Sequence, residues 1–456
     1  MKRKLLLILS ALLVTMTAWA DASGSCGYYA TYSYVEETHT LTISGEWKMT
    51  DFTSGGTPWY SYRTSITTVV IDEGVTTIGN YAFSHFTNLT SITIPSTVES
   101  IGQYALYNCS KLTSVHINSG VTSIYRTAFD DCDELVNITV AADNTKFSSE
   151  NGVLFNKDKT TLVQYPIGKT GAYTIPNSVT IIEEAAFYDC AKLTSVTMPS
   201  NLSRVKDYSF QDCTGLTSVV FPSSVTLIGG YAFMNCSRLA SVTLNSNPNI
   251  VSGAFKNVKS DCVIRMYLAA REGEASEYWT TFYSYYNTFQ VDENTHVFKA
   301  ALEGTSLELT ELTTDQIITK NNAVILKSSS SPMVLTLTTS SSSNDFSDNS
   351  LMGVSSADGK TANGTHFVLN KGIQGVGFYR MTSGMKIGVG KAYLTYSGAL
   401  AREFFGFEES TGINTTDCTV YTDENGKWYT LDGRRIQGKP SKQGIYINNG
   451  KKVVIK

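Results

Sequence analysis

The sequence predicts a mainly β protein whose first half is a solenoid of 23-residue coils. Leucines recur every 23 residues in two runs, and an aromatic or leucine position six residues before each of them keeps the same period. Self-similarity at a period of about 20 to 29 residues is typical of leucine-rich-repeat solenoids, in which one short strand per unit stacks on the next. The leucines are Leu89, Leu112, Leu135, Leu193, Leu216 and Leu239, and the second positions are Phe83, Leu106, Phe129, Phe187, Phe210 and Phe233.

The first 20 residues have the pattern of a secretory signal peptide. Lys2, Arg3 and Lys4 form a basic start, residues 5–14 are an apolar run, and residues 18–20 form a small-x-small cleavage site. The apolar run is shorter than the ~18 residues that a membrane helix needs, and no later stretch reaches that length. We therefore expect an exported protein, cleaved after Ala20, with no transmembrane segment.

The charge balance argues against nucleic acid as a partner. Without the three basic residues of the signal peptide, 33 Lys and Arg stand against 40 Asp and Glu. The resulting net charge of about −7 would repel a phosphate backbone.

Residues 21–65 are expected to form an N-terminal cap. Residues 40–45 alternate like a strand, and residues 57–62 are rich in aromatic side chains. The first coil of a stacked array needs such a cover, because its apolar end would otherwise face water. Trp59, Tyr60 and Tyr62 then form the lid, which we favour over the alternative of a sugar-stacking platform.

The solenoid itself is predicted to run from residue 66 to 262. In one coil Ile92 and Ile94 alternate with polar neighbours, as in a strand with one face in the core. Val98 and Ile101 turn inward again, and residues 104–106 are expected to form one helical turn on the opposite side. Leu135 and Leu193 are 58 residues apart instead of 23, so we expect a hairpin-like insert at about 141–171, built from residues 153–155 and 162–165.

Five of the eight cysteines occupy one column of the repeat, again 23 residues apart. Neighbouring coils lie ~4.8 Å apart, whereas disulfide-bonded Cβ atoms lie ~3.8 Å apart. We therefore interpret the column as buried free thiols that fill a narrow slot in the core. No histidine stands at zinc-ligand spacing from them. The column is Cys109, Cys132, Cys190, Cys213 and Cys236; Cys26, Cys262 and Cys418 lie outside it, and a bridge among these three stays open.

Beyond the repeats, residues 263–410 are predicted to form an all-β domain, a sandwich or a barrel. Short alternating runs such as residues 333–337 and 366–369 are separated by turns rich in Gly and Ser. A linker then leads to a small C-terminal β unit within 411–456. Asn449 and Gly450 between two apolar runs indicate a hairpin turn there.

These residues carry a resemblance to a known family. Units such as residues 216–233 (LTSVVFPSSVTLIGGYAF) resemble the BspA-type leucine-rich repeats of Bacteroidetes surface proteins. Residues 23–27, 41–45 and 58–62 resemble the lead-in segment of that family, and residues 444–447 with 451–456 are similar to the C-terminal sorting signals of type IX secretion. The resemblance implies a secreted or cell-surface protein, and characterised members act as adhesins that bind host matrix proteins or other bacteria.

The candidate partner-binding face is the polar side of the repeat strands. Ser and Thr suit any solvated sheet face, but solenoids commonly use such a surface for binding. The face carries little charge and few aromatic residues. Its residues are Ser91, Thr93, Ser114, His116, Asn137, Thr139, Ser195, Thr197, Ser218, Val220, Ser241 and Thr243.

We predict no catalytic, cofactor-binding or metal-binding residues. The five histidines are scattered, and none stands in a nucleophile motif, a metal signature or a phosphate loop. The sequence thus favours a non-enzymatic surface protein associated with the outer membrane, an adhesin for host matrix or bacterial surface proteins. Two alternatives stay open: a glycan-binding or nutrient-capture protein that uses residues 263–410, and a structural stalk that displays them.

Overall fold

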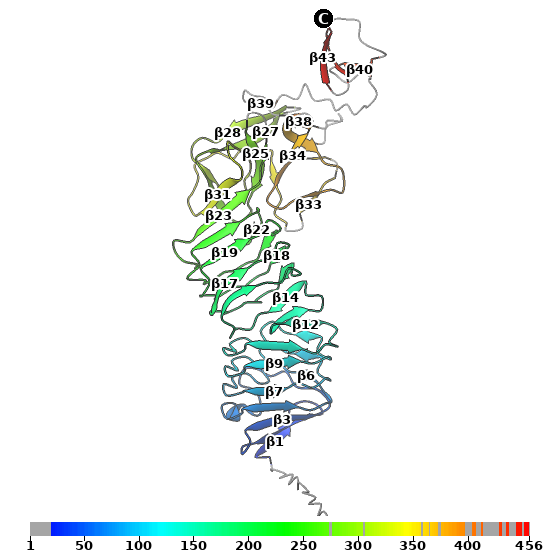
Figure 1. Ribbon diagram of the computed structural model, residues 1–456, viewed down its shortest axis with the longest axis vertical. Coiled ribbons are helices and arrows are strands. Elements are labelled where there is room, and N and C mark those ends of the chain that lie inside the picture. The colour runs from blue at the N-terminus through cyan, green and yellow to red at the C-terminus, as the bar shows by residue number, and fades with distance from the viewer. Residues whose placement is uncertain are drawn as a thin grey trace, which may run out of the picture. The chain divides into compact units, whose positions relative to one another are not determined.

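The computed structural model describes residues 20–272, 276–303, 306–356, 359–363, 365–372 and 375–396, and the backbone of six short strands beyond residue 396. Apart from Ala20, the predicted signal peptide lies outside the described residues. The described part is mainly β (Figure 1). Its only helix is the 3-10 turn η1 (Tyr60–Tyr62). The chain divides into two compact units, residues 1–157 with 166–168, and residues 158–165 with 169–456.

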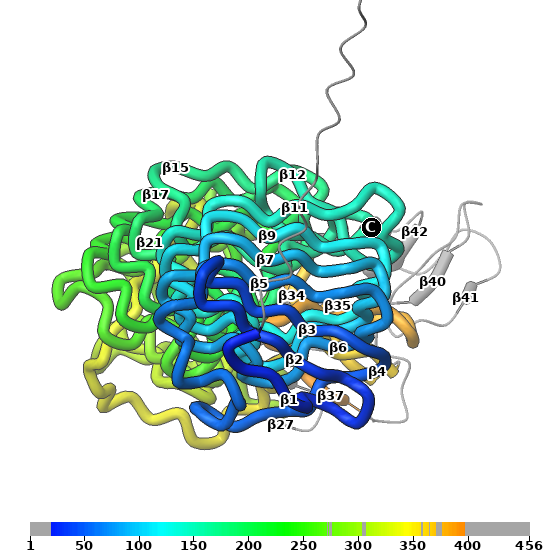
Figure 2. The backbone as a smooth tube through the Cα atoms, turned by 90° about the horizontal axis from the view of Figure 1, so that it is seen from below, coloured from blue at the N-terminus to red at the C-terminus, as the bar shows by residue number. Residues whose placement is uncertain are grey.

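In the first unit each full coil contributes one strand to each of two sides, and most strands of neighbouring coils pair in parallel. Strand partners are 23 residues apart, as Val69 and Ile92 are, or Ser100 and Ser123. Along one side of the coils the strands follow one another as two parallel pairs (Figure 2). They are β5 (Thr68–Ile71), β7 (Ser91–Thr93), β9 (Ser114–Ile117) and β11 (Asn137–Val140); those of the second side are β6 (Val75–Ile78), β8 (Ser100–Ile101) and β10 (Ser123–Ile124).

Three antiparallel strands begin the first unit. They are β1 (Ala22–Ser25), β2 (Ala30–Val35) and β3 (Thr40–Gly45), and β3 then pairs in parallel with β5 of the first coil. The short strand β4 (Trp47–Lys48) pairs with β6 in the same way. The strands from residues 22–48 thus supply the first coil with partners on both of its sheets.

The second unit repeats the pattern of paired strands on two sides with the same period, and the β-solenoid has about nine turns of ~23 residues. Arg204 pairs with Leu227 on one sheet, and Ser218 with Ser241 on the other. The strands are β14 (Thr161–Gln164), β16 (Ile181–Ile182), β18 (Arg204–Val205), β20 (Leu227–Ile228) and β22 (Asn249–Ile250), with β15 (Gly171–Thr174), β17 (Leu193–Thr197), β19 (Ser218–Phe221), β21 (Ser241–Leu244) and β23 (Val263–Leu268).

The third side of each coil is not helical, and the expectation of a helical turn at residues 104–106 is wrong. Tyr104 and Asn108 both have left-handed φ angles, of 52° and 55°, so the backbone passes through successive tight turns. Alternate amides then point toward the next coil: Leu106 N donates to Ala128 O at 2.9 Å, and Asn108 N to Asp130 O at 2.9 Å. Hydrogen bonds between coils therefore replace the i→i−4 bonds that a helix would form.

The cysteine column is confirmed as free, buried thiols. The carbonyl of Phe187 accepts two hydrogen bonds, one from the amide of Cys190 in its own turn at 3.2 Å and one from Sγ of Cys213 in the next coil at 3.0 Å. Each of the other four column thiols also donates to a backbone carbonyl of the preceding coil. Among the cysteines outside the column, Cys26 and Cys262 are free as well, and Cys418 lies outside the described residues.

Beside the thiols, an aromatic ladder fills the core of the second unit. The rings of Phe187 and Phe210 stack with centroids 4.5 Å apart, and those of Phe210 and Phe233 with centroids 4.8 Å apart. All three rings are fully buried, as are the leucines of the repeat. Stacking at the coil spacing explains why the aromatic position keeps the 23-residue period so strictly.

The irregular stretch after β11 contains a hairpin that the sequence did not reveal. Strands β12 (Phe147–Glu150) and β13 (Val153–Asn156) pair antiparallel around Asn151 and Gly152. Fully buried Asn144 fixes the start of this hairpin: its Nδ2 donates to the carbonyls of Asn118 and Val121, and its Oδ1 accepts from the amides of residues 146 and 147. Both segments predicted as hairpin strands are strands, β13 and β14, and the insert bounds of 141–171 stay a prediction.

The C-terminal part of the second unit consists of further β-sheets, as expected. One of them continues the solenoid: β23 pairs in parallel with β21 on one edge and antiparallel with β31 on the other. Two further sheets share a core that contains Trp279, Ile325, Phe367, Phe378 and Leu394. The continuing sheet adds β31 (Met333–Thr338), β26 (Thr288–Val291) and β29 (Ile317–Ile318).

The two sheets around this core form a sandwich. The first has the order β24 (Arg271–Glu272), β25 (Tyr278–Tyr283), β30 (Ala323–Ser328), β27 (Thr295–Glu303), β28 (Ser306–Glu311) and β39 (Gly412–Ile413). The second has the order β32 (Met352–Gly353), β37 (Ala392–Thr395), β34 (His366–Gly372), β35 (Gly375–Arg380) and β38 (Phe404–Gly406), with the pair β33 (Lys360–Thr361) and β36 (Lys386–Ile387) apart from it.

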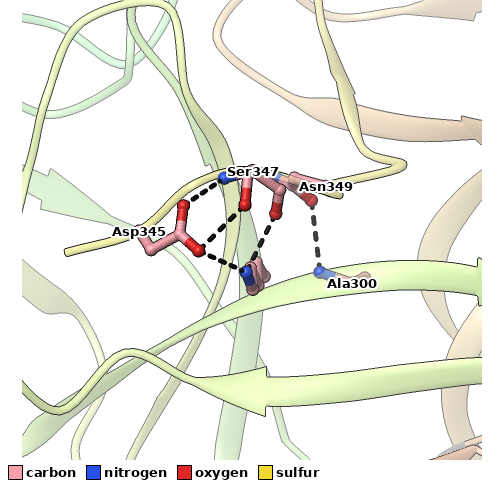
Figure 3. Close-up of polar contacts among 5 residues, drawn as sticks. Ala300, Asp345, Ser347 and Asn349 are labelled. Atoms are coloured by element: carbon pink, nitrogen blue, oxygen red, sulfur yellow. Dashed lines mark hydrogen bonds and ion pairs between the residues drawn. The ribbon is translucent and has the colours of Figure 1, made fainter.

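A polar clip holds the segment before β32 onto β27. Asp345 accepts hydrogen bonds from the amide and the hydroxyl of Ser347, both at 2.8 Å, and lies 3.6 Å from the ammonium of Lys299 (Figure 3). Lys299 donates in turn to the carbonyl of Ser347 at 2.9 Å, and the amide of Ala300 donates to Oδ1 of Asn349 at 3.2 Å. The clip gives this strand-free stretch a defined path over the sheet.

At the end of the chain, four backbone strands form a small sheet. They are β40 (Trp428–Thr430), β41 (Arg435–Ile436), β42 (Gly444–Asn448) and β43 (Lys451–Ile455). Strand β42 pairs antiparallel with β43, and Asn448 faces Lys451. This register is that of the predicted hairpin; its turn residues 449 and 450 lie outside the described residues.

Candidate functional site

In the first unit the predicted face is exposed and polar. Along β9, Ser114 and His116 point to solvent while Val115 and Ile117 are buried, because successive side chains of a strand point to opposite faces. Parallel pairing brings Asn137 beside Ser114 and Thr139 beside His116. Of the six predicted residues here, five are exposed and Thr139 is half-buried.

A side-chain contact links two coils on this face. Nδ1 of His116 lies 2.8 Å from Oγ1 of Thr139. Such contacts between coils order the side chains without withdrawing them from solvent. The face offers hydroxyl, amide and imidazole groups, which donate and accept hydrogen bonds, and no carboxylate or ammonium among the predicted residues.

The same pattern recurs in the second unit. Ser218 faces Ser241 and Val220 faces Thr243 across β19 and β21, while Ser195 and Thr197 lie on β17. Val220 is the one apolar member, with 55% of its surface exposed. Ser195, Thr197, Ser218 and Val220 are exposed, and Ser241 and Thr243 are half-buried. The assignment of these twelve residues to a partner-binding face stays a prediction.

Trp59 does not belong to any surface platform. Its side chain is fully buried, and its indole Nε1 donates to the carbonyl of Ala82 at 2.8 Å. Its ring packs against Tyr32, Phe52 and Phe83, with centroids 5.2 to 6.1 Å away. Trp59 therefore packs between the N-terminal strands and the first coil, which argues against a sugar-stacking role for this residue. The lid formed by Trp59, Tyr60 and Tyr62 together stays a prediction.

A different aromatic cluster is exposed, and the sequence did not reveal it. Tyr28, Tyr29 and Trp47 have 85%, 54% and 61% of their surfaces exposed. Their rings lie close together, with centroids 4.5 Å apart for Tyr28 and Tyr29 and 5.4 Å apart for Tyr29 and Trp47. Trp47 has a φ of 73°, a conformation that is unfavourable for a bulky residue and recurs at functional sites. In the sequence, the one feature that could have indicated this cluster is the pair Tyr28 and Tyr29 directly after Gly27.

The described residues contain no group of three His, Cys, Asp or Glu placed to hold a metal ion. Burial raises the pKa of the column thiols Cys109, Cys190 and Cys213 well above the usual 9.0, and that of Cys236 to about 12. A thiol that keeps its proton is a poor nucleophile and a poor metal ligand. These cysteines therefore serve packing.

In the described part of the chain, no helix has the length and apolarity to cross a membrane.

The repeat geometry agrees with a comparison against known families. Residues 57–167 and 165–265 match the BspA type leucine rich repeat region, in six copies. The repeats of this part of the chain are thus similar to those of the BspA type. Such regions typically occur in non-enzymatic binding proteins that are secreted or on the cell surface.

Solved structures of bacterial leucine-rich repeat proteins are similar to this repeat region. A leucine-rich repeat protein from Eubacterium ventriosum is 26% identical over 53% of this chain and 76% of that chain, with a TM-score of 0.40. A leucine rich cell surface protein from Faecalibacterium prausnitzii is 20% identical over 52% of this chain and 94% of that chain, with a TM-score of 0.27. A leucine-rich repeat protein from Bacteroides ovatus is 20% identical over 51% of this chain and 67% of that chain, with a TM-score of 0.31. No curated protein matches the chain.

Proposed function

We propose that this chain is a non-enzymatic adhesin, secreted or held at the outer membrane, that contacts host matrix proteins or other bacterial cells through the strand face of its solenoid. The observation that carries the proposal is the in-register polar face of both units, where exposed side chains such as Ser114, His116 and Ser218 stand above a buried apolar layer. Within each unit, neighbouring paired strands repeat this chemistry every ~4.8 Å, so the contact surface is regular.

A face of this kind suits recognition by many weak contacts. Hydroxyl and amide groups exchange hydrogen bonds with a partner's backbone and side chains, and each such bond contributes about 0.5–1.5 kcal/mol net. Because the face lacks charge, association through it should depend little on salt. Recognition then uses an extended surface rather than one deep pocket.

Introduction of a charge on the face tests the proposal. In the secreted chain, residues 21–456, Ser114→Arg and Ser218→Arg place a long cation on the exposed strands β9 and β19. Ser123→Arg, on exposed β10 of the other sheet, is the matched control. Binding to a panel of immobilised matrix proteins and to bacterial cells should weaken about tenfold or more, ~1.4 kcal/mol, for the face variants only. Equal binding by all three variants would contradict partner binding through the solenoid face.

We further propose export through the type IX route, with the tail as its sorting signal. The support is the resemblance of residues 444–447 and 451–456 to such signals. Deletion of residues 444–456 should leave the protein in the periplasm, as measured by surface labelling and cell fractionation. Unchanged surface display would contradict the sorting role.

Glycan binding is the second candidate, and the exposed cluster of Tyr28, Tyr29 and Trp47 favours it. Aromatic rings that stand free in solvent offer apolar faces on which the C–H bonds of a sugar ring can stack. Trp47→Ala should abolish binding to a glycan array while it leaves matrix binding unchanged. Binding of sugars only through residues 263–410 would instead favour the nutrient-capture alternative, and a chain that binds through neither part would be a stalk.

A further inference from the structure

The C-terminal β-sandwich region contains a cleft of about 370 Å³. Its volume lies within the ~300–1,000 Å³ range of small-molecule sites. The walls come from β25, β34, β36 and the start of β37, so segments more than 100 residues apart in the sequence meet there. The residues that form it are Ala269, Ala270, Thr280, Thr281, Val368, Leu369, Met381, Lys386, Ile387, Gly388, Lys391 and Ala392.

The charged side chains that line the cleft in the described part of the chain are both lysines, Lys386 and Lys391. The surrounding sequence has the same bias. Residues 351–400 contain five Lys and Arg against one acidic residue, Asp358, in a chain whose net charge is −4. A cationic cleft in an acidic protein concentrates anions locally.

One ammonium is held in place by a buried hydroxyl. Nζ of Lys391 donates to Oγ1 of Thr280 at 3.2 Å, and Thr280 is 3% exposed. Beside it, Oγ1 of Thr281 accepts a hydrogen bond from the amide of Ala392 at 3.1 Å, which ties β25 to the first residue of β37. Lys386, by contrast, lies at the exposed start of β36. The two charges thus differ in setting, one anchored within the cleft and one exposed.

Much of the rest of the lining is apolar, with the aliphatic side chains of Val368, Met381 and Ile387 among it. Val368 and Met381 also pack against the buried cluster of Val354, Ile387 and Tyr393, which supports this wall of the cleft. A hydrated inorganic ion would gain nothing from such a surface, and a neutral apolar molecule would gain nothing from the lysines. The combination fits a ligand that has an anionic head and a short apolar body.

We propose that this cleft binds a small organic anion, with its carboxylate or phosphate head at Lys386 and Lys391 and its apolar body against Val368, Met381 and Ile387. The site goes beyond adhesion through the solenoid face and uses different residues. Its failure and the failure of the adhesin proposal are therefore separable, because Ser114→Arg leaves the cleft intact and the lysine variants leave the face intact.

Displacement of a fluorescent probe tests this site in the chain of residues 21–456. The probe is 8-anilinonaphthalene-1-sulfonate, an anion with an apolar body, and the competitors are hexanoate, hexyl phosphate, 1-hexanol and inorganic phosphate. Hexanoate or hexyl phosphate should displace the probe at concentrations about tenfold or more below those of hexanol and inorganic phosphate, since hydrogen bonds to charged groups contribute strongly to affinity. Whichever of the two displaces the probe better identifies the head group.

The lysine variants complete the test. Lys386→Gln and Lys391→Gln should each weaken displacement about tenfold, and Lys320→Gln, an exposed lysine of the same region outside the cleft, should not change it. Since Lys386 is exposed, Lys386→Gln serves as the test if Lys391→Gln fails to fold. Equal displacement by hexanol and hexanoate, or unchanged affinity in Lys386→Gln, would overturn the proposal.

Discussion

Truncation of one column thiol tests how the coils are held together. Cys213 is fully buried, and its thiol gives the carbonyl of Phe187 a second hydrogen bond at 3.0 Å. Cys213→Ala removes a group of about methylene size, worth ~0.8 kcal/mol in transfer. It also removes a weak-donor hydrogen bond, worth ~0.5–1 kcal/mol, and leaves a cavity of about 20 Å³ that costs ~0.5 kcal/mol. The expected loss in the free energy of unfolding is therefore about 2 kcal/mol.

Urea denaturation of the chain of residues 21–456, followed by circular dichroism, measures this loss. Cys262→Ala is the matched control, because Cys262 is only half-buried and lies outside the column; we expect it to cost less than ~0.5 kcal/mol. Alkylation should agree: native Cys213 should resist iodoacetamide until the chain unfolds. A Cys213→Ala variant as stable as the control would refute a packing role for the column.

Three further predictions follow from the turns, the thiols and the insert. Burial raises the pKa of Cys236 from 9.0 to about 12, so above pH 9 the unfolded chain binds fewer protons than the folded chain. The contribution of this thiol to the free energy of unfolding is therefore complete below pH 9 and is lost toward pH 12 at ~1.4 kcal/mol per pH unit. Urea midpoints should therefore fall less steeply with pH in Cys236→Ala, and parallel slopes would contradict this. Ala185 and Ala186 are both buried, but of the two only Ala185 has a left-handed φ, of 57°. Ala185→Gly should therefore be more stable than Ala186→Gly by ~1 kcal/mol, because relief of left-handed strain offsets the lost methyl contacts; equal thermal midpoints would contradict this. Asn144→Ala removes four hydrogen bonds of a fully buried side chain and should cost ~2–4 kcal/mol in urea denaturation, and a loss below 1 kcal/mol would show that its clamp is dispensable.

The repeat period predicted most of the core, because one residue of each type must stack on its copy in the next coil. Leu193, Phe210 and Cys213 are buried where that logic placed them. The turn side was predicted wrongly as helical. Tyr-Ala-Leu at residues 104–106 has an ordinary helix propensity, and only the hydrogen bonds to the neighbouring coil select left-handed φ at Tyr104. Such bonds link residues that are distant in the chain, so local propensity cannot show them.

The candidate sites were predicted less completely. Strand alternation correctly indicated which side chains would face solvent, since Ser114 and His116 are exposed and Val115 is buried. The sequence pattern does not distinguish buried from exposed tryptophans, because Trp59 and Trp47 both follow turn-rich segments. Only tertiary packing decides that Trp59 is buried and Trp47 exposed. The cleft joins distant parts of the sequence: Lys391 lies 111 residues after Thr280, to which it donates a hydrogen bond. No local motif marks such a site.

Site-specific photo-crosslinking tests the adhesin proposal most directly. A benzoylphenylalanine is introduced in place of Ser114, of Ser218, or of Ser123 on the other sheet, and each chain of residues 21–456 is irradiated while bound to a matrix protein or to bacterial cells. The proposed function predicts crosslinks from positions 114 and 218 and none from position 123. Crosslinks from position 123 alone, or equal yields from all three positions, would contradict recognition through the strand face.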